Sequence, residues 1–181
     1  MKIRWSIALL AALSAALMLV ACGPADLPDT SDTTAAPAAE QTEPTAPPAV
    51  YGFTVSDTLL YAGADPAVLT ALGQPQDLLE APSCTHAGMD RVYYYAGFEV
   101  NTQPTAAGGE VIVSVYLTDD SVTTPEGLYI GATLDAVKAA YGEPAKQADG
   151  LCSYAKTDGG VTGQVNFVIG ADGTVTSIYY N

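Results

Sequence analysis

An internal repeat in residues 51–181 is the feature that most limits how this chain can fold. Short motifs recur in the same order at a spacing of 68 to 69 residues. These are LYAG at 60–63 and LGQP at 72–75, which are answered by LYIG at 128–131 and YGEP at 141–144. Each copy also carries one cysteine and ends in a similar run, VIVSVYL at 111–117 and TVTSIYY at 174–180. The pattern predicts two similar copies, at about 57–120 and 126–181.

A short helix is expected at the start of each copy. In the first copy, Asp65 is a suitable N-cap and Pro66 suits the first helical position. Gly73 can adopt the left-handed conformation that ends a helix, and Pro75 prevents its continuation. The corresponding residues of the second copy are Thr133, Gly142 and Pro144.

Runs rich in tyrosine and β-branched residues follow each helix and predict antiparallel strands. They span residues 91–101, 110–118, 163–169 and 174–180, with a further strand expected at 51–56. The loop at 170–173 has the glycine and aspartate of a hairpin turn, and Gly108–Gly109 suits another turn. The predicted fold class is therefore α+β, with two tandem repeats of a short helix followed by antiparallel strands that together form one sheet-containing domain.

These motifs resemble a known repeat. A short helix that ends in LGQP or YGEP, followed by a hairpin that closes on a V-x-S-I-type strand, is similar to the repeat of β-lactamase-inhibitor-protein-like domains, whose fold the SmpA/OmlA-type outer-membrane lipoproteins share. The second copy also resembles uncharacterised lipoproteins of Gram-positive gut bacteria. The resemblance covers about residues 57–181 and implies protein binding through the sheet face or loops. The inhibitors carry a disulfide within each repeat, whereas this chain has one cysteine per copy.

The amino terminus has the layout of a cleaved secretion signal at residues 1–21. Lys2 and Arg4 precede an apolar run at 7–20 that is too short for a confident membrane span. The junction LVAC at 19–22 resembles the bacterial lipobox, in which lipid is attached to the cysteine. We therefore expect a lipid anchor on Cys22 and an extracytoplasmic location at the cell membrane. The alternative is a signal peptide that is cut elsewhere beside an incidental cysteine.

Residues 22–50 have the composition of a spacer. Proline, alanine, threonine and acidic residues dominate, and the segment has no aromatic and no basic residue. Such a segment cannot bury enough apolar area to offset its ordering entropy, so it is predicted to be a disordered linker. It would hold the globular domain, residues 51–181, away from the membrane.

Charge excludes one class of partner. Without residues 1–21 the chain keeps four basic and 20 acidic residues, a formal net charge of −16. The basic residues are Arg91, Lys138, Lys146 and Lys156. Because such a surface repels phosphate backbones, a nucleic-acid partner is not expected.

The two cysteines of the globular region, Cys84 and Cys152, occupy matching places in the copies. An oxidising compartment and pseudo-two-fold packing predict a disulfide that joins the copies. Two separate reduced thiols are the alternative. A metal site that adds His86 and Asp90 is conceivable, but the spacing lacks the paired cysteines of zinc sites, so no metal or cofactor is expected.

The tyrosines supply candidates for a contact surface. Most of the eleven are expected in the core, because buried tyrosine contributes a large apolar area. Exposed tyrosine is also a frequent contact residue of protein interfaces. The candidates for a binding surface are Tyr94, Tyr116, Tyr179 and Tyr180.

Motifs of common enzymes are missing, among them G-x-S-x-G, H-E-x-x-H, S-x-x-K and the P-loop, and the chain has a single histidine. The sequence therefore favours a membrane-anchored binding or interaction module with a protein partner and without catalytic residues. Two alternatives remain: an inhibitor of a β-lactamase or cell-wall hydrolase, and a structural component of an envelope assembly.

Overall fold

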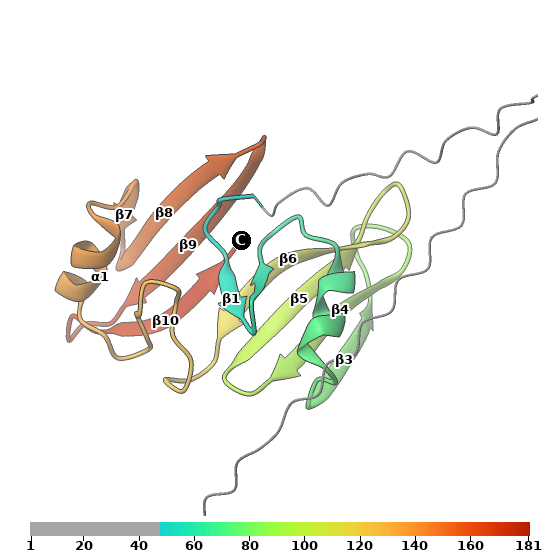
Figure 1. Ribbon diagram of the computed structural model, residues 1–181, viewed down its shortest axis with the longest axis horizontal. Helices are drawn as coiled ribbons and strands as arrows, with labels where there is room; N and C mark the ends of the chain where they lie inside the picture. Colours follow the sequence, from blue (N-terminus) through green and yellow to red (C-terminus); the bar gives the residue numbers. More distant parts are fainter. Residues whose placement is uncertain (1–47) are drawn as a thin grey trace, which may run out of the picture. The chain divides into compact units, whose positions relative to one another are not determined.

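An eight-stranded antiparallel sheet dominates the computed structural model, which describes residues 48–181 (Figure 1). Its strand order is β3-β4-β5-β6-β10-β9-β8-β7, so two four-stranded meanders, β3–β6 and β7–β10, meet in the middle. The strands are β3 (Asp77–Pro82), β4 (Met89–Tyr95), β5 (Phe98–Pro104), β6 (Glu110–Leu117), β7 (Lys146–Ala148), β8 (Leu151–Asp158), β9 (Val161–Ile169) and β10 (Val175–Tyr180).

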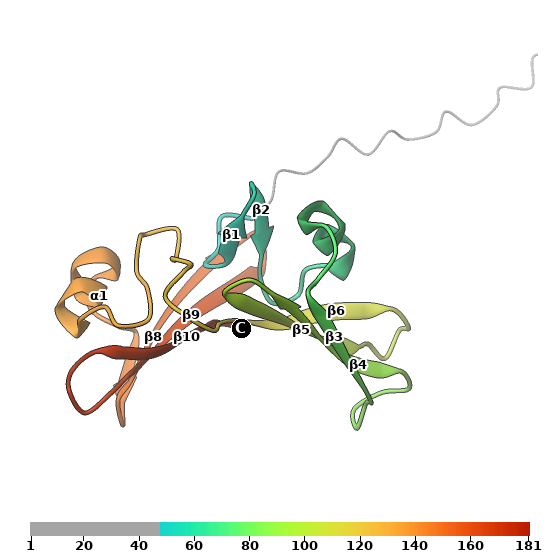
Figure 2. The same ribbon diagram turned by 90° about the horizontal axis from the view of Figure 1, so that it is seen from below.

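The remaining elements lie on one side of this sheet (Figure 2). They are the hairpin of β1 (Phe53–Val55) and β2 (Thr58–Leu60), the 3-10 helix η1 (Pro66–Leu72) and the α-helix α1 (Leu134–Tyr141). No element of residues 48–181 covers the opposite side, which we call the open face (Figure 2). The strand period of two therefore divides every strand into residues that face the core and residues that face outward.

The core lies between the sheet and this layer. A row of apolar side chains from β5, β6, β10 and β9 is in register there, and each is at most 1% exposed: Val100, Val115, Tyr180 and Val165. Phe53 of β1 packs its ring against Phe98 of β5, at a centroid distance of 5.0 Å, and against Tyr180 of β10, at 6.2 Å. The hairpin thus braces the junction of the two meanders, because these two rings belong to different meanders.

The junction itself is short. Strands β6 and β10 pair through three residue pairs, Val115–Tyr180, Tyr116–Tyr179 and Leu117–Ile178. By comparison, β8 and β9 pair along eight residues. The sheet is therefore continuous, but the ladder that joins its two meanders at the centre is short.

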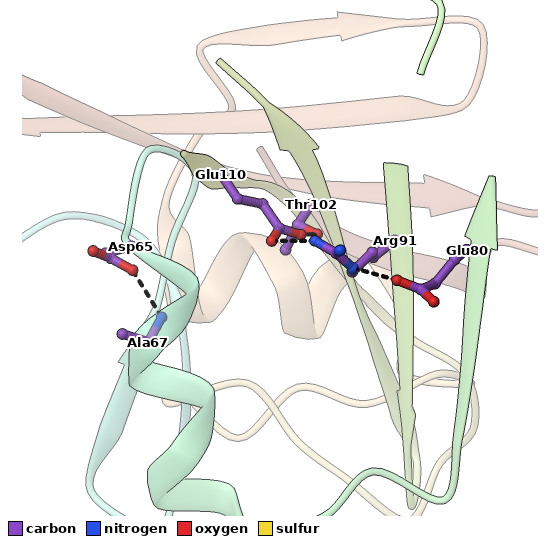
Figure 3. A network of polar contacts seen from close by, with 6 residues as sticks. All are labelled: Asp65, Ala67, Glu80, Arg91, Thr102 and Glu110. Atoms are coloured by element: carbon purple, nitrogen blue, oxygen red, sulfur yellow. Dashed lines mark hydrogen bonds and ion pairs between the residues drawn. The ribbon is translucent and has the colours of Figure 1, made fainter. Parts of the chain in front are cut away.

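Both helices begin at the residues that the sequence predicts. The Asp65 side chain accepts a hydrogen bond from the Ala67 N–H at 2.8 Å (Figure 3), and Thr133 caps α1 through the Ala136 N–H at 3.2 Å. Gly73 follows η1 with a positive φ of 79°, which a residue with a side chain adopts at a cost. The first helix is nevertheless a 3-10 helix, which the capping signals do not distinguish from an α-helix.

The predicted α+β class with two helix-and-strand repeats is wrong. Strands make up 46% of the described residues and helices 11%, in two short helices, so residues 48–181 form a mostly β fold around one large sheet. The LYAG and LYIG motifs make the same backbone hydrogen bonds in the turns at 61–64 and 129–132, but only the first copy of the motif follows a strand, since Leu60 ends β2 whereas Leu128 lies outside any strand. Similar short motifs here reflect similar turns and caps, which recur in many folds.

The strand predictions were right in part. The run 91–101 is not one strand but the hairpin of β4 and β5, because Gly97 adopts a positive φ of 80° and turns the chain. Strands at 110–118, 163–169 and 174–180 and the turn at Gly108–Gly109 are present. Strands β2, β3, β7 and β8 were not predicted; β2 has only three residues, and the sequences of the other three mix charged and small residues, with a proline in β3.

The described part begins with a segment that packs on the sheet. Val50 is 8% exposed, and the Ala49 N–H donates to Asp158 at 2.8 Å. The backbone of Tyr51 lies directly on Gly163 of β9, where an added Cβ would lie 2.1 Å from the Tyr51 carbonyl oxygen. A glycine is therefore required at this position of β9.

An ion network joins the four strands of the β3–β6 meander (Figure 3). Arg91 of β4 donates from Nε to Glu80 of β3 at 2.7 Å and from a terminal guanidinium nitrogen to Glu110 of β6 at 2.6 Å. The Thr102 hydroxyl of β5 donates to the same Glu110. The hydrogen bond to Glu80 raises the pKa of Arg91. These contacts fix the strands at one end of the meander. They also pair Arg91, one of the four basic residues of 22–181, with two carboxylates.

The predicted signal at 1–21, the lipidated Cys22 and the linker up to residue 47 lie outside the described residues. Among residues 48–181, no helix has the length and apolar character needed to cross a membrane.

Candidate functional site

A row of polar and aromatic side chains crosses the open face. One residue of each strand contributes to it, and each lies opposite the next in register. In strand order the row is Asp77, Tyr94, Glu99, Tyr116, Tyr179, Asn166, Ser153 and Lys146. These positions alternate with the buried row of Val100 and Val115, so they point away from the core.

Tyr116 and Tyr179 stack on each other at the centre of this row. Their ring centroids are 5.0 Å apart and the ring planes differ by 19°. Both side chains are partly exposed, and they come from β6 and β10, the two strands that join the meanders. The pair therefore forms an aromatic platform over the junction, and cross-strand aromatic pairs of this kind also stabilise the pairing.

Glu99 lies between two aromatic residues of the row. It is opposite Tyr94 on β4 and opposite Tyr116 on β6, and its side chain is partly exposed. None of the ion pairs within residues 48–181 involves the Glu99 carboxylate. The centre of the open face therefore combines rings with an uncompensated negative charge.

A shallow hollow of about 230 Å³ adjoins the aromatic platform. Among its lining residues are Lys146, Ser153, Gln164, Asn166 and Tyr179. Ser153 Oγ and Gln164 Nε2 both donate to Asn166 Oδ1 at 2.7 Å. The Asn166 amide in turn donates to the side chain of Asn181 at 2.8 Å. The floor of the hollow is thus a polar network, in which Ser153 and Asn166 are buried, beside the partly exposed ring of Tyr179.

The structure brings three of the four candidate tyrosines to this surface. Tyr94, Tyr116 and Tyr179 share the open face, whereas Tyr180 is 1% exposed and belongs to the core. The inclusion of Tyr180 was wrong because adjacent residues of a strand point to opposite faces. Leu79 and Val92, which are opposite each other on β3 and β4, add apolar area to the same face, and Leu79 is 55% exposed. Because two leucines are adjacent at 78 and 79, the sequence shows no alternation of apolar and polar residues there, and it did not predict which leucine faces outward.

The structure does not bring Cys84 and Cys152 together, and both thiols are free. Cys84 is exposed in the turn between β3 and β4, and Cys152 is buried in β8. Six strand spacings of about 4.8 Å separate β3 from β8, roughly 29 Å, whereas a disulfide requires Cα atoms within about 7 Å. The predicted bridge is therefore wrong: equivalent positions in the two meanders lie far from the junction. Burial also raises the pKa of the Cys152 thiol.

The conceivable metal site is not assembled either. His86 and Asp90 lie near Cys84, at the opposite end of the strand order from Cys152. Residues 48–181 contain no group of three or more histidine, cysteine, aspartate or glutamate side chains that could hold a metal ion.

A second tyrosine cluster lies on the core side. The Tyr141 hydroxyl of α1 donates to Glu126, and its ring packs against Tyr154 and Phe167 at 5.1 and 5.2 Å. Burial, reinforced by this hydrogen bond, raises the pKa of Tyr141 far above its ordinary value. Burial also raises the pKa of Tyr154 to about 12. These tyrosines serve packing and do not contribute to the open face.

Comparison with known proteins adds no relative: no family model matches the chain, and no curated protein and no solved structure gives a significant match.

Proposed function

We propose that this protein is a lipid-anchored, extracytoplasmic binding module that engages a protein partner through the open face of its sheet. The anchor at Cys22, the spacer and the export signal are the features predicted from the sequence. Within residues 48–181, the uncovered face of the sheet supports the proposal.

One observation carries the proposal: Tyr94, Tyr116 and Tyr179 share a face that no other element of residues 48–181 covers. Tyrosine and other aromatic residues are enriched where proteins bind each other, since a rigid ring contributes a large area at a small entropic cost. Leu79 and Val92 extend the apolar part of the face, and the hollow beside Tyr179 supplies polar groups. Aromatic rings combined with apolar and polar groups are typical of interfaces.

Photo-crosslinking in living cells tests the proposal. A photoreactive phenylalanine derivative replaces Tyr179 in one strain and Tyr129 in the control strain, because Tyr129 is 46% exposed and lies outside the open face. We expect a defined crosslinked protein from position 179 and none from position 129. Equal capture from both positions, or no capture from position 179, would contradict the proposal. The captured protein also separates an envelope assembly from a β-lactamase or cell-wall hydrolase.

A further inference from the structure

The centre of the open face has the composition of a site for a cation. Tyr94, Glu99 and Tyr116 occupy neighbouring strands β4, β5 and β6 in one register row. Neighbouring strands lie about 4.8 Å apart, so a group that contacts the ring of Tyr94 or Tyr116 can also reach the Glu99 carboxylate. We call these three residues the Tyr–Glu–Tyr site.

Charge on this face is not balanced from within residues 48–181. Arg91 is paired with Glu80 and Glu110, and Lys138 is paired with Glu143 at 3.2 Å. Lys156 is opposite Gly163, a position that faces the core side. Lys146 is in the same row as Glu99, but five strand spacings away, roughly 24 Å. No basic side chain of the described chain therefore neutralises Glu99.

We propose that the Tyr–Glu–Tyr site binds a guanidinium or ammonium side chain of the protein partner. The inference rests on the proposed function and specifies the partner's chemistry: a basic residue, arginine in the first instance, projects from an exposed surface onto the sheet. A guanidinium can stack on a tyrosine ring while its N–H groups donate to the carboxylate, so both interactions add at one place. The formal net charge of −14 for the whole chain attracts the same class of partner over a longer range.

The experiment titrates the full ¹⁵N-labelled chain in nonionic detergent with acetyl-Gly-Arg-Gly-amide, followed by amide chemical shifts. The same peptide with citrulline in place of arginine keeps the shape and removes the charge. We expect saturable shifts at residues 94, 99 and 116 with the arginine peptide and weaker ones with the citrulline peptide. Glu99→Gln should weaken arginine binding at least about fivefold.

Glu143→Gln is the matched control, because it removes the same charge from an exposed side chain outside the open face. It should change the affinity less than about twofold. A second variant, Tyr94→Leu, removes a ring and keeps every charge, and it should also weaken binding. Thermal unfolding of each variant shows whether it is folded.

Three results would overturn the inference: equal binding of the two peptides, equal affinity of the Glu99→Gln and Glu143→Gln variants, or shifts spread over all acidic residues. Its failure is distinguishable from that of the proposed function. If position 179 captures a protein but Glu99→Gln binds arginine normally, the binding module stands and the Tyr–Glu–Tyr site does not.

Discussion

Two tyrosine hydroxyls on the core side of the sheet differ in their hydrogen bonding. The Tyr141 hydroxyl donates to Glu126, whereas the Tyr180 hydroxyl has no hydrogen-bond partner within residues 48–181. Leaving a buried polar group unpaired costs free energy, and removing a bonded group forfeits its bond. The same tyrosine-to-phenylalanine change should therefore have opposite effects at the two positions.

Tyr141→Phe should lower the free energy of unfolding by about 1–2 kcal/mol, because it removes a hydrogen bond to a charged group. Tyr180→Phe should leave it within about 0.5 kcal/mol or raise it, since no bond is lost. Urea denaturation of both variants measures the difference. A larger loss for Tyr180→Phe than for Tyr141→Phe would contradict the hydrogen bonding assigned to the two hydroxyls.

The buried phenols of Tyr154 and Tyr180 make stability depend on alkaline pH. Burial raises the pKa of Tyr154 to about 12 and the pKa of Tyr180 well above its ordinary value. The unfolded chain releases these protons near pH 10, so it binds fewer protons than the folded state above that pH. We expect full stability below about pH 10 and a decline above it, seen as a urea midpoint that falls between about pH 10 and pH 12. Tyr154→Phe should flatten the decline, and an unchanged slope would argue against the role of Tyr154.

Single residues also show what the sequence could reveal. Alternation along a strand places the adjacent residues Tyr179 and Tyr180 on opposite faces, but it was not applied to this pair, and Tyr180 faces the core. Glu99 was not predicted as a site residue, because its importance depends on Tyr94 and Tyr116 from neighbouring strands. Registers between strands are set by turns and bulges, such as the bulge between Asn101 and Thr102, that a single sequence does not announce.

At the scale of elements, the hairpin β1–β2 and the segment before it act as a brace across the sheet. Phe53 contacts rings of both meanders, and the Tyr51 backbone lies on Gly163 of β9. The docking of this segment requires that Gly163 has no side chain.

Gly163→Ala should lower the free energy of unfolding by about 1–3 kcal/mol, because the added Cβ would overlap the Tyr51 carbonyl oxygen. Faster amide hydrogen exchange at residues 50–60 should accompany the loss. Thr162→Ala, at the exposed neighbouring position of β9, is the control; it removes only an exposed hydroxyl contact with Thr157 and should have little effect on either measurement. Unchanged exchange in the Gly163→Ala variant would show that the segment is docked by other contacts.

Local signals predicted elements better than they predicted the fold class. Caps at Asp65 and Thr133 and the turn at Gly108–Gly109 depend on a few adjacent residues, and the structure contains them. The short edge strands β3 and β7 depend on pairing with distant neighbours, so their mixed sequences do not announce them. Because these strands were not predicted, the strand content was underestimated relative to the two helices, and this led to the α+β prediction.

For the whole molecule, the separation of the cysteines makes a direct prediction. In the absence of reductant, with Cys22 replaced by serine, Cys84 should react with a thiol reagent in the folded protein and Cys152 after unfolding. The exposed Cys84 and the buried Cys152, whose thiol pKa is raised, account for this order. Absorbance of the released chromophore counts the thiols. If neither cysteine reacts in denaturant, the two form a disulfide, which would contradict their separation across the sheet.

The three residue pairs between β6 and β10 have a mechanical consequence. A partner bound to Tyr116 and Tyr179 contacts both meanders at once, while Phe53 packs on the other side of the same junction. A partner bound there would connect the two meanders across the short β6–β10 ladder and oppose bending of the sheet at that place. The occupied protein should therefore be stiffer than the free one, and hydrogen exchange along β6 and β10 should slow most when the partner is bound.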